Sequence, residues 1–371
     1  MRVLVTGGAG FVGSHLVDAL VAAGCEVRVL DALAAQVHGA DRKRPAYLHP
    51  AAELVVGDLL DRAALASALE GVEAVVHQAA AVGVGQSMYE IARYVRENSL
   101  GTAVLLEEVV ARRGAIRRLV VASSMSIYGE GLYLDAGGRP VFPPPRRAEQ
   151  VAAREWELRD EAGRALVPAP TPETKPLCPT SVYAVTKRDH EELCLAVGAA
   201  YEIPTVALRY FNVYGPRQSL SNPYTGVLAI FASRILNRRR PLVYEDGLQT
   251  RDFVHVSDVA QANRLALERP EAAGRVYNVG TGRATRILEV AERLGAALGA
   301  AEPPDVPGRF RAGDVRHCVA DVTRIRRELG YEPRVAFAEG LRELLDWVRE
   351  QPAEDRLDEA TRELAARGLA R

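Results

Sequence analysis

Cysteine is scarce in this sequence of 371 residues, which contains four cysteines at widely separated positions. None of them pairs with another at the spacing of a metal knuckle, so we expect no metal site and a reducing, cytoplasmic setting. An excess of either charge is also lacking, because 47 Lys and Arg face 48 Asp and Glu and leave a net charge of −1. This balance argues against nucleic acid or an anionic membrane surface as the main partner.

Long apolar runs are missing as well. The longest stretches without a charged residue are 74–89 and 218–233, and polar residues interrupt both. Each is shorter than the roughly 20 residues that a membrane-spanning helix needs. The apolar run within residues 1–8 is too short for a signal peptide and predicts a strand. Since 48% of the residues are hydrophobic, we expect a soluble protein with a large packed core and no membrane partner.

The sequence does contain a regular alternation of short β-branched runs and longer helical patterns. Strands are predicted at Arg2–Thr6, Glu26–Asp31, Glu53–Val56, Ala74–Gln78, Arg118–Ser123 and Thr205–Arg209. Helices are predicted near 11–23, 61–70, 87–113 and 181–201. Strands that are apolar on both faces and alternate with helices are typical of a parallel sheet covered on each side. The expected fold class is therefore α/β, with a doubly wound parallel sheet.

The second half of the chain departs from this alternation. We expect residues 1–185 to form the sheet domain, with strands near 205–210 and 253–256 rejoining its sheet. Residues 186–350 would form a smaller C-terminal α/β lobe. The charged, weakly amphipathic residues 351–371 predict a peripheral helix or a frayed tail.

A long insert is predicted within the sheet domain. Residues 130–180 are rich in Pro and Gly, and they are too many for an ordinary connection. The centre of this range, 146–158, is expected to hold a short helix around Trp156.

A glycine-rich turn follows the first predicted strand and opens the first predicted helix. Its sequence is Gly7-Gly8-Ala9-Gly10-Phe11-Val12-Gly13. Glycine lets such a turn bring its amides close to a pyrophosphate, and the helix N-terminus favours the negative charge. Asp31 ends the next strand, where a carboxylate can bind ribose hydroxyls, and no Arg or Lys follows it directly. The pattern therefore predicts NAD rather than NADP, bound by Gly7, Gly10, Phe11, Val12, Gly13 and Asp31.

A second acidic position follows the third predicted strand. Asp58, with Leu59 after it, is placed where it could meet the adenine of the cofactor. A role in capping the next helix is an equally good interpretation of Asp58.

Four polar residues form the predicted catalytic group. Tyr183 and Lys187 are four residues apart on a predicted helix, so their side chains lie on one face. A nearby ammonium lowers the pKa of a phenol, which would let Tyr183 exchange a proton with a substrate hydroxyl. Ser124 and Ser126 follow a predicted strand, at the carboxyl edge where open α/β sheets bind ligands. Their hydroxyls can donate to a carbonyl oxygen or pass a proton to Tyr183.

Together these motifs resemble the extended short-chain dehydrogenase/reductase family, in its nucleotide-sugar epimerase/dehydratase branch. Further blocks that resemble this family are His77-Gln78-Ala79-Ala80, Asn98-Ser99-Leu100-Gly101-Thr102, residues 208–217 and residues 251–258. The resemblance covers nearly the whole chain. It implies a Rossmann-type NAD-binding domain, a lobe for a nucleotide-sugar substrate, and a homodimer formed through helices near 87–113 and 181–201.

The resemblance also implies roles for single residues. Tyr183 would be the acid/base and Lys187 its partner, with Ser124 and Ser126 as catalytic hydroxyls. The residues implied beside the cofactor are Gln78, Ala79, Ala80, Asn98, Tyr183 and Lys187. The residues implied to bind the nucleotide sugar are Ser87, Ser124, Asn212, Arg251, Arg311 and Cys318.

Within the family, positions 124 to 126 indicate the reaction. The 4,6-dehydratases carry Thr-Asp-Glu there, and the UDP-glucuronate decarboxylases carry a Glu at the third place, whereas this chain has Ser124-Met125-Ser126. Without those carboxylates an elimination lacks its acid and base, and Ser-x-Ser is similar to what 4-epimerases use. We therefore expect a nucleotide-sugar 4-epimerase, in which C4 is oxidised and the 4-keto sugar is reduced on its other face. The alternatives are a UDP-glucuronate decarboxylase or related enzyme, and an NAD-binding redox sensor.

The identity of the sugar is less well defined. The insert and residues 215–226 resemble a bacterial subgroup of dTDP-L-rhamnose 4-epimerases, although the Cys-x-x-Cys pairs of that subgroup are missing around 135–138 and 160–163. Cys318 matches a gate position where a small side chain leaves room for a larger sugar. A simple buried cysteine is the equally weighted alternative. The expected substrate is a dTDP- or UDP-sugar.

Overall fold

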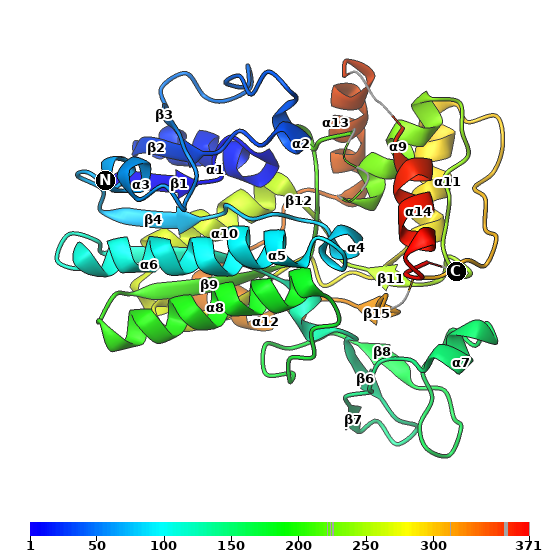
Figure 1. The fold of residues 1–371 in the computed structure, drawn as a ribbon. Coiled ribbons are helices and arrows are strands. Elements are labelled where there is room, and N and C mark those ends of the chain that lie inside the picture. The colour runs from blue at the N-terminus through cyan, green and yellow to red at the C-terminus, as the bar shows by residue number, and fades with distance from the viewer. Residues whose placement is uncertain (221, 223, 225, 312, 352–354, 371) are drawn as a thin grey trace.

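A seven-stranded parallel sheet forms the centre of the protein (Figure 1). The computed structural model describes all residues except 221, 223, 225, 312, 352–354 and 371, so parts of the predicted tail and of the 215–226 block lie outside the described residues. The strand order is β13-β9-β5-β4-β1-β2-β3, and each neighbouring pair is parallel. The strands are β1 (Arg2–Thr6), β2 (Glu26–Asp31), β3 (Glu53–Val56), β4 (Ala74–His77), β5 (Arg118–Ser124), β9 (Thr205–Tyr210) and β13 (Arg275–Val279).

Alternate residues of each strand point into two separate cores. Val3 and Val5 of β1 belong to one apolar cluster and Leu4 belongs to the other, as the two-residue period of a strand requires. The first cluster includes side chains of α1 (Phe11–Ala22), α10 (Val256–Glu268) and α12 (Thr323–Leu329). The second includes side chains of α3 (Arg62–Ala68), α6 (Gly101–Ala111) and α8 (Val182–Ala200). Helices therefore cover both faces of the sheet, and the expected doubly wound fold is confirmed.

The six strands predicted from the sequence agree with the structure to within one residue, and the return of 205–210 to the sheet is confirmed. The prediction that 253–256 also rejoins it is wrong. The segment forms β12 (Phe253–His255), which pairs with β10 (Asn212–Tyr214) in a separate two-stranded sheet. The chain leaves the large sheet directly after β9, where the amide of Asn212 donates to the carbonyl of Asp252 over 2.9 Å. The seventh strand is β13, which the sequence analysis did not predict.

The helix predicted at 87–113 is divided into several pieces. These are α4 (Val84–Ser87), α5 (Ile91–Tyr94), a π-helical turn η1 (Val95–Leu100) and α6. The wider π turn changes the hydrogen-bonding pattern around Asn98, and such turns are frequent at functional sites. The predicted helix at 181–201 is α8, which is continuous through residue 185, so the sheet layer extends beyond the predicted domain boundary.

A smaller lobe packs its helices around a third apolar cluster, to which Phe231, Leu294 and Leu344 belong. Its helices are α9 (Val227–Leu236), α11 (Ile287–Leu298) and α13 (Phe337–Arg349), and its three-stranded sheet consists of β14 (Thr285–Arg286), β11 (Thr250–Arg251) and β15 (His317–Cys318). The C-terminal segment forms α14 (Leu357–Ala366), and its Leu357 is buried against Leu242 and Tyr244. Within the described part of the chain, no helix combines the length and the apolar character needed to cross a membrane.

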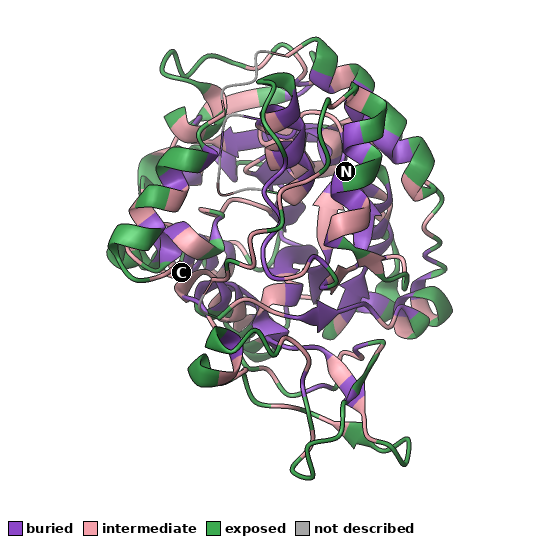
Figure 2. Ribbon diagram, turned by 90° about the vertical axis from the view of Figure 1, so that its right-hand side faces the viewer, coloured by how far each residue is buried: buried purple, intermediate pink, exposed green. Residues whose placement is uncertain are grey.

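The insert forms a small layer of its own that projects away from the sheet (Figures 1 and 2). It contains an antiparallel sheet and one short helix, namely β6 (Leu132–Leu134), β7 (Pro140–Val141), β8 (Val167–Ala169) and α7 (Ala148–Ala152). The short helix predicted at 146–158 is therefore present, but it ends before Trp156. The side-chain amide of Gln150 donates to the backbone carbonyls of Glu155 and Glu157. These bonds fix the irregular path of the chain beyond the helix.

Candidate active site

The glycine-rich turn lies between β1 and α1, and close packing explains its glycines. Gly7 has a φ of 69°, and a Cβ there would lie 2.8 Å from the backbone of Ala79, which follows β4. A Cβ on Gly13 would overlap the carbonyl oxygen of Gly7. Only glycine lets the turn, the first helix and the end of β4 meet in this way. The amides of Phe11 and Val12 lie in the first turn of α1, where they are free of helical partners and can face an anion.

Asp31 stands at the end of β2, beside the glycine-rich turn. Its carboxylate accepts hydrogen bonds from the amides of Ala9, over 3.0 Å, and Leu33, over 2.9 Å. These bonds fix an acidic group at the edge where the sequence predicted contacts with the adenosine ribose.

Asp58 is exposed and accepts from the amide of Leu60, whereas the cap of α3 is Asp61. The carboxylate of Asp58 is thus not the helix cap that we had weighed as an alternative.

Hydrogen bonds of two side-chain amides, those of Gln78 and Asn98, fix the residues after β4. The Nε2 of Gln78 donates to the Tyr210 hydroxyl over 2.8 Å and to Oδ1 of Asn263 over 3.1 Å. Asn98 accepts from the amide of Ala81 and donates to its carbonyl, and it also donates to Thr186 on α8. Asn98 therefore ties the loop that contains Ala79 and Ala80 to the helix that carries the predicted catalytic pair.

The predicted catalytic hydroxyls meet at the end of β5. Ser124 begins a short 3-10 turn, η2 (Met125–Tyr128), and its Oγ accepts from the hydroxyl of Ser126 over 3.0 Å. The phenol of Tyr183 is buried beside Ser124. Burial raises the pKa of Tyr183 to about 12, and the hydroxyl of Ser124 lowers it by less than burial raises it. The structure therefore places Tyr183 beside the hydrogen-bonded pair of Ser124 and Ser126.

Ser87, which we expected to contact substrate, holds the start of α8. Its Oγ donates to the carbonyl of Val84 over 2.7 Å and accepts from the amide of Tyr183 over 3.0 Å. Ser181 caps the same helix by accepting from the amide of Ala184. These two serines fix the position of the first turn of α8, which carries Tyr183.

Lys187 lies one turn after Tyr183 and is buried, with 4% of its surface exposed. Burial lowers the pKa of its ammonium to about 7. Its Nζ lies 3.3 Å from Nδ1 of His190, a further turn along α8. The sequence analysis did not single out His190, although a histidine three residues after the lysine lies on the same helix face.

A buried ion pair supports this group from behind and was also missed. Glu191 accepts from Arg209 on β9 over 2.9 and 2.5 Å and from the Ser123 hydroxyl over 2.7 Å. Arg209 in turn donates to the hydroxyl of Tyr128 and lies over its ring, 4.8 Å from the centroid. The network joins β5, η2, α8 and β9, the elements that carry or adjoin the predicted catalytic serines and Tyr183. Arg209 was part of a family block, but its partner lies on another element and could not be identified from sequence.

Asn212 and Arg251, expected at the diphosphate, lie where the sheet meets the smaller lobe. The Oδ1 of Asn212 is buried and has no hydrogen-bond partner among the described residues, which leaves an acceptor available for a ligand. Arg251 donates to the carbonyls of Thr250, Val315 and Arg316 and lies 3.7 Å from the carboxylate of Asp314.

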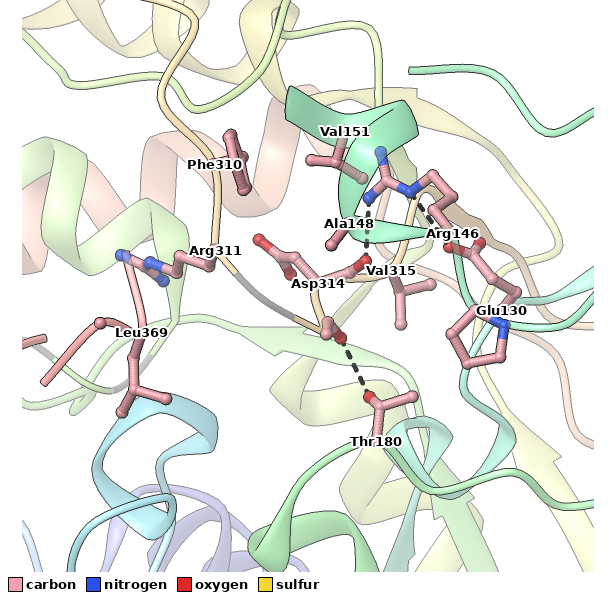
Figure 3. A pocket seen from close by; sticks show the side chains of 13 residues that line it. Glu130, Arg146, Ala148, Val151, Thr180, Phe310, Arg311, Asp314, Val315 and Leu369 are labelled. Carbon is pink, nitrogen blue, oxygen red and sulfur yellow. Dashed lines mark hydrogen bonds and ion pairs between the residues drawn. The ribbon is translucent and has the colours of Figure 1, made fainter. Parts of the chain in front are cut away.

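Arg311 lies in the loop that leads from the smaller lobe towards β15. Its guanidinium stacks on the ring of Tyr244, 4.3 Å from the centroid, and its buried Nε has no partner among the described residues. Beside it is a pocket of about 170 Å³, lined also by Asp314, Thr180 and Leu369 (Figure 3). Asp314 thus lies 3.7 Å from Arg251 and lines the same pocket as Arg311.

Cys318 is buried, with 1% of its surface exposed. It is paired in register with Arg251, and its Sγ lies 3.8 Å from the hydroxyl of Thr171 in the insert. Burial raises the pKa of the thiol to about 12. These contacts are those of a packed cysteine, which was the alternative interpretation of this position.

A sequence profile of the NAD-dependent epimerase/dehydratase family matches residues 3–148 and 161–280 of the chain. The match covers the glycine-rich turn, the serines after β5, and Tyr183 with Lys187. The chain belongs to this family. The gap in the match, 149–160, falls within the insert, so the insert is where this epimerase/dehydratase family member differs from the common pattern.

Similar proteins support the family assignment over almost the whole length. The dTDP-L-rhamnose 4-epimerase of Burkholderia thailandensis is 39% identical over 94% of this chain and 95% of its own length. The structure of a Thermotoga maritima UDP-glucose 4-epimerase with UDP-glucose has a TM-score of 0.76 and 30% identity, and covers 94% of this chain and 99% of its own. The structure of a Thermus thermophilus UDP-glucose 4-epimerase with NAD has a TM-score of 0.73 and 34% identity, and covers 95% and 100%.

NAD is the cofactor of the family, and the residues present fit it. The turn between β1 and α1 is a cradle that a Cβ at Gly7 or Gly13 would fill, and Asp31 provides a carboxylate at its edge. The buried ammonium of Lys187 and the loop tied by Asn98 lie at the ends of the neighbouring elements. Backbone amides, an acid and a cation are the groups that a dinucleotide needs.

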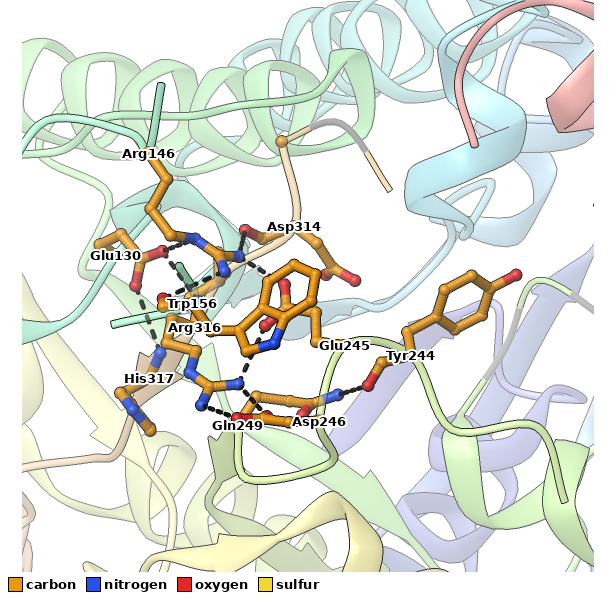
Figure 4. Close-up of polar contacts among 12 residues, drawn as sticks. Glu130, Arg146, Trp156, Tyr244, Glu245, Asp246, Gln249, Asp314, Arg316 and His317 are labelled. Carbon is orange, nitrogen blue, oxygen red and sulfur yellow. Dashed lines mark hydrogen bonds and ion pairs between the residues drawn. The ribbon is translucent and has the colours of Figure 1, made fainter. Parts of the chain in front are cut away.

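A network of buried charges attaches the insert to the smaller lobe in this family member (Figure 4). The Arg316 side chain is fully buried and bonds to Glu157 of the insert and to Glu245 and Asp246 of the lobe. Arg146 of the insert pairs with Glu245 over 2.7 Å. Among the described residues, no group of His, Cys, Asp and Glu is arranged to hold a metal ion.

The stretches where the Cys-x-x-Cys pairs are missing carry two similar turns. Asp135 accepts from the amide and the guanidinium of Arg139. Asp160 accepts from the amide and guanidinium of Arg164 in the same way. Both turns read Asp-x-x-Gly-Arg, and side-chain bonds of this kind stabilise tight turns without metal.

The C-terminal helix α14 spans from the smaller lobe to the sheet domain. Asp358 pairs with Arg234 of α9, and Glu363 accepts from the hydroxyl of Tyr89, which follows α4. Arg367 lies over the Tyr89 ring, 4.3 Å from its centroid. The helix lines a second cleft of about 590 Å³ together with residues of α2 (Ala35–His38). The predicted tail is therefore a helix that contacts both parts of the molecule.

Proposed function

We propose that this enzyme is a nucleotide-sugar 4-epimerase that acts on dTDP-L-rhamnose or a related dTDP- or UDP-sugar. The observation that carries the proposal is the position of Tyr183 beside the hydrogen-bonded pair of Ser124 and Ser126, with no carboxylate at positions 124 to 126. Such a group can move a proton to and from a sugar hydroxyl, but it has no acid at the third place to drive elimination. The similarity to the Burkholderia thailandensis dTDP-L-rhamnose 4-epimerase supports the choice of sugar.

In the proposed reaction, Tyr183 accepts the proton of the sugar O4. Bound NAD would take the hydride from C4 and return it to the same carbon. Ser124 donates to O4, while Ser126 donates to Ser124 and so fixes its orientation. Burial alone keeps the phenol of Tyr183 protonated, so the ammonium of Lys187 is needed to stabilise the phenolate. When the 4-keto sugar presents its other face, Tyr183 returns the proton.

For substrate binding, we propose that Arg251 and Arg311 hold the diphosphate and that Asn212 contacts it. The unpartnered Nε of Arg311 supports this role, because buried polar atoms without partners are rare and often await a ligand. Asn212 would contact the diphosphate through its side-chain NH2, since its Oδ1 can only accept. A guanidinium suits phosphate oxygens because its donors form a planar fork. The carboxylate of Asp314 lies 3.7 Å from Arg251, so a diphosphate would compete with it for this arginine.

The test is to incubate the enzyme with dTDP-L-rhamnose, UDP-glucose, UDP-N-acetylglucosamine and UDP-glucuronate and to identify the products by NMR. The proposal expects the C4 epimer of at least one of them. Release of carbon dioxide from UDP-glucuronate would support the decarboxylase instead. Failure to convert or bind any of these four sugars, although NAD is present, would contradict the proposal and favour the redox sensor.

Tyr183→Phe tests the mechanism itself. We expect turnover to fall by about 10²- to 10⁴-fold, the usual contribution of a general acid/base, while the affinity for NAD stays unchanged in calorimetry. Unchanged turnover would contradict the role of Tyr183.

We also propose that the enzyme is a cytoplasmic homodimer. The helices α5, η1 and α8 expose Ile91, Val95, Leu100, Val185 and Leu193, which are 37% to 52% accessible. The α6 and α8 helices run side by side on one face (Figure 1), and an apolar face of this kind is typical of a subunit interface. All four cysteines are unpaired, as expected in a reducing compartment. Analytical ultracentrifugation of Val95→Glu should show a monomer if this face forms the dimer.

A further inference from the structure

His190 is a buried group that the proposed mechanism does not use. Its side chain is fully buried, and its Nδ1 is the one hydrogen-bond partner of the Lys187 ammonium among the described residues. An ammonium has only donors, so when Lys187 is charged, Nδ1 of the neutral ring accepts and the ring proton is on Nε2. A buried charge without an acceptor is costly, which makes this contact important for keeping Lys187 charged.

The ring of His190 is fixed from its other side. It stacks on His77 at the end of β4, with centroids 5.0 Å apart and an angle of 24°. His77 bonds to the hydroxyl of Thr6 over 2.8 Å and to that of Thr102 over 2.9 Å. Both imidazoles are neutral, since burial lowers the pKa of His77 to about 3 and that of His190 well below its ordinary value. A neutral ring can accept at Nδ1 throughout the working pH range.

The π-helical turn provides the remaining neighbour of His190. The backbone carbonyl of Asn98, in this turn, raises the pKa of the His190 ring. The Nε2 of His190 nevertheless has no hydrogen bond of normal geometry among the described residues. The other titratable groups that face the Lys187–His190 pair are His77 of β4 and Cys194 of α8. Tyr94 of α5 faces Tyr183. The described surroundings contain no carboxylate that could replace His190 as the acceptor.

We propose that His190 is a positioning residue that accepts from Lys187 and keeps its ammonium charged on the face that carries Tyr183. The inference rests on the proposed acid/base role of Tyr183 and deepens it. Without the acceptor, the buried lysine loses its proton more readily, and Tyr183 loses the cation that stabilises its phenolate. His190 thereby sets the pH at which the active site can accept a proton, although it does not contact the substrate itself.

The experiment compares three substitutions of similar size but different acceptor position. His190→Asn places an amide oxygen where Nδ1 lies, His190→Gln places it near Nε2, and His190→Met fills the space without an acceptor of comparable strength. We expect the acid limb of kcat/KM against pH to move up by about one unit in His190→Met and His190→Gln. This shift would reduce kcat/KM about tenfold below the limb. His190→Asn should stay within about twofold of the wild type.

A second measurement separates this inference from the proposed function. The ultraviolet titration of the Tyr183 phenol is recorded without substrate and isolated by subtraction of the same variants carrying Tyr183→Phe. Its midpoint should rise in His190→Met and be restored in His190→Asn, even if the enzyme acts on another sugar or catalyses another reaction. Equal loss of activity in all three variants with unmoved midpoints would show that His190 only packs the core and would overturn the proposal. Thermal unfolding with NAD content serves as the control for folding.

Discussion

The glycine-rich turn and the insert both bring distant segments into close contact, but they do so in different ways. At the turn, the absence of side chains at Gly7 and Gly13 lets three elements meet. The insert has a very small apolar core, formed by Tyr133, Leu158 and Leu166, and is attached by the charges around Arg316. One contact depends on shape and the other on the pairing of buried ions, so the two should respond differently to substitution and to pH.

The insert should be the more sensitive of the two to loss of a single side chain. Arg316→Met removes the cation that Glu157, Glu245 and Asp246 share, and leaves Glu245 with Arg146 as its cationic partner. Breaking such a pair from one side costs about 3–5 kcal/mol, and we expect a loss of this size in the free energy of unfolding by urea. The control is Arg139→Met, because Arg139 is 81% exposed and pairs with Asp135, four residues away. It should cost less than about 1 kcal/mol, and equal losses would contradict a special role for the Arg316 network.

The glycine-rich turn should respond to an added methyl group. In Gly13→Ala the new Cβ would overlap the carbonyl of Gly7, and overpacking of this kind costs about 1–3 kcal/mol. Because the displaced turn also carries the cofactor cradle, we expect NAD affinity in calorimetry to fall at least tenfold. Gly114→Ala is the matched control, since a Cβ there would meet nothing within 4 Å and should change stability by less than about 0.5 kcal/mol. Tight NAD binding by Gly13→Ala would show that the turn is not the cradle.

The difference between local contacts and contacts with distant residues explains what could be predicted from the sequence. Apolar β-branched runs marked β1 to β5 and β9, and the glycine spacing marked the cofactor end, because both depend on neighbours in the chain. The strand β13 was missed because Tyr277 and Asn278 make it partly polar. The side-chain oxygen of Asn278 accepts a hydrogen bond from the hydroxyl of Tyr128, far away in the sequence. The network around Arg316 joins residues 157, 245 and 316, and no local pattern indicates such a pairing. His190 lies between these cases, since its spacing from Lys187 was visible but its acceptor role depends on the stack with His77.

The smallest expected effect is the pH dependence of the insert. Hydrogen bonds from His317 and Arg316 lower the pKa of Glu157 from 4.5 to about 2. A carboxyl with a lowered pKa in the folded state stabilises it at pH values above the unfolded pKa, and this contribution is lost as the pH falls. We therefore expect wild type to be more stable than Glu157→Gln above pH 4.5, with a difference that shrinks between pH 4.5 and about 2. Because Glu157 is 41% exposed, solvent weakens the effect.

Urea unfolding of wild type and Glu157→Gln between pH 2 and pH 7 measures this difference in stability, with Glu149→Gln as a control in α7. A constant difference between wild type and Glu157→Gln at all pH values would mean that the glutamate contributes by packing rather than by its charge, which would remove the contrast with the glycine-rich turn.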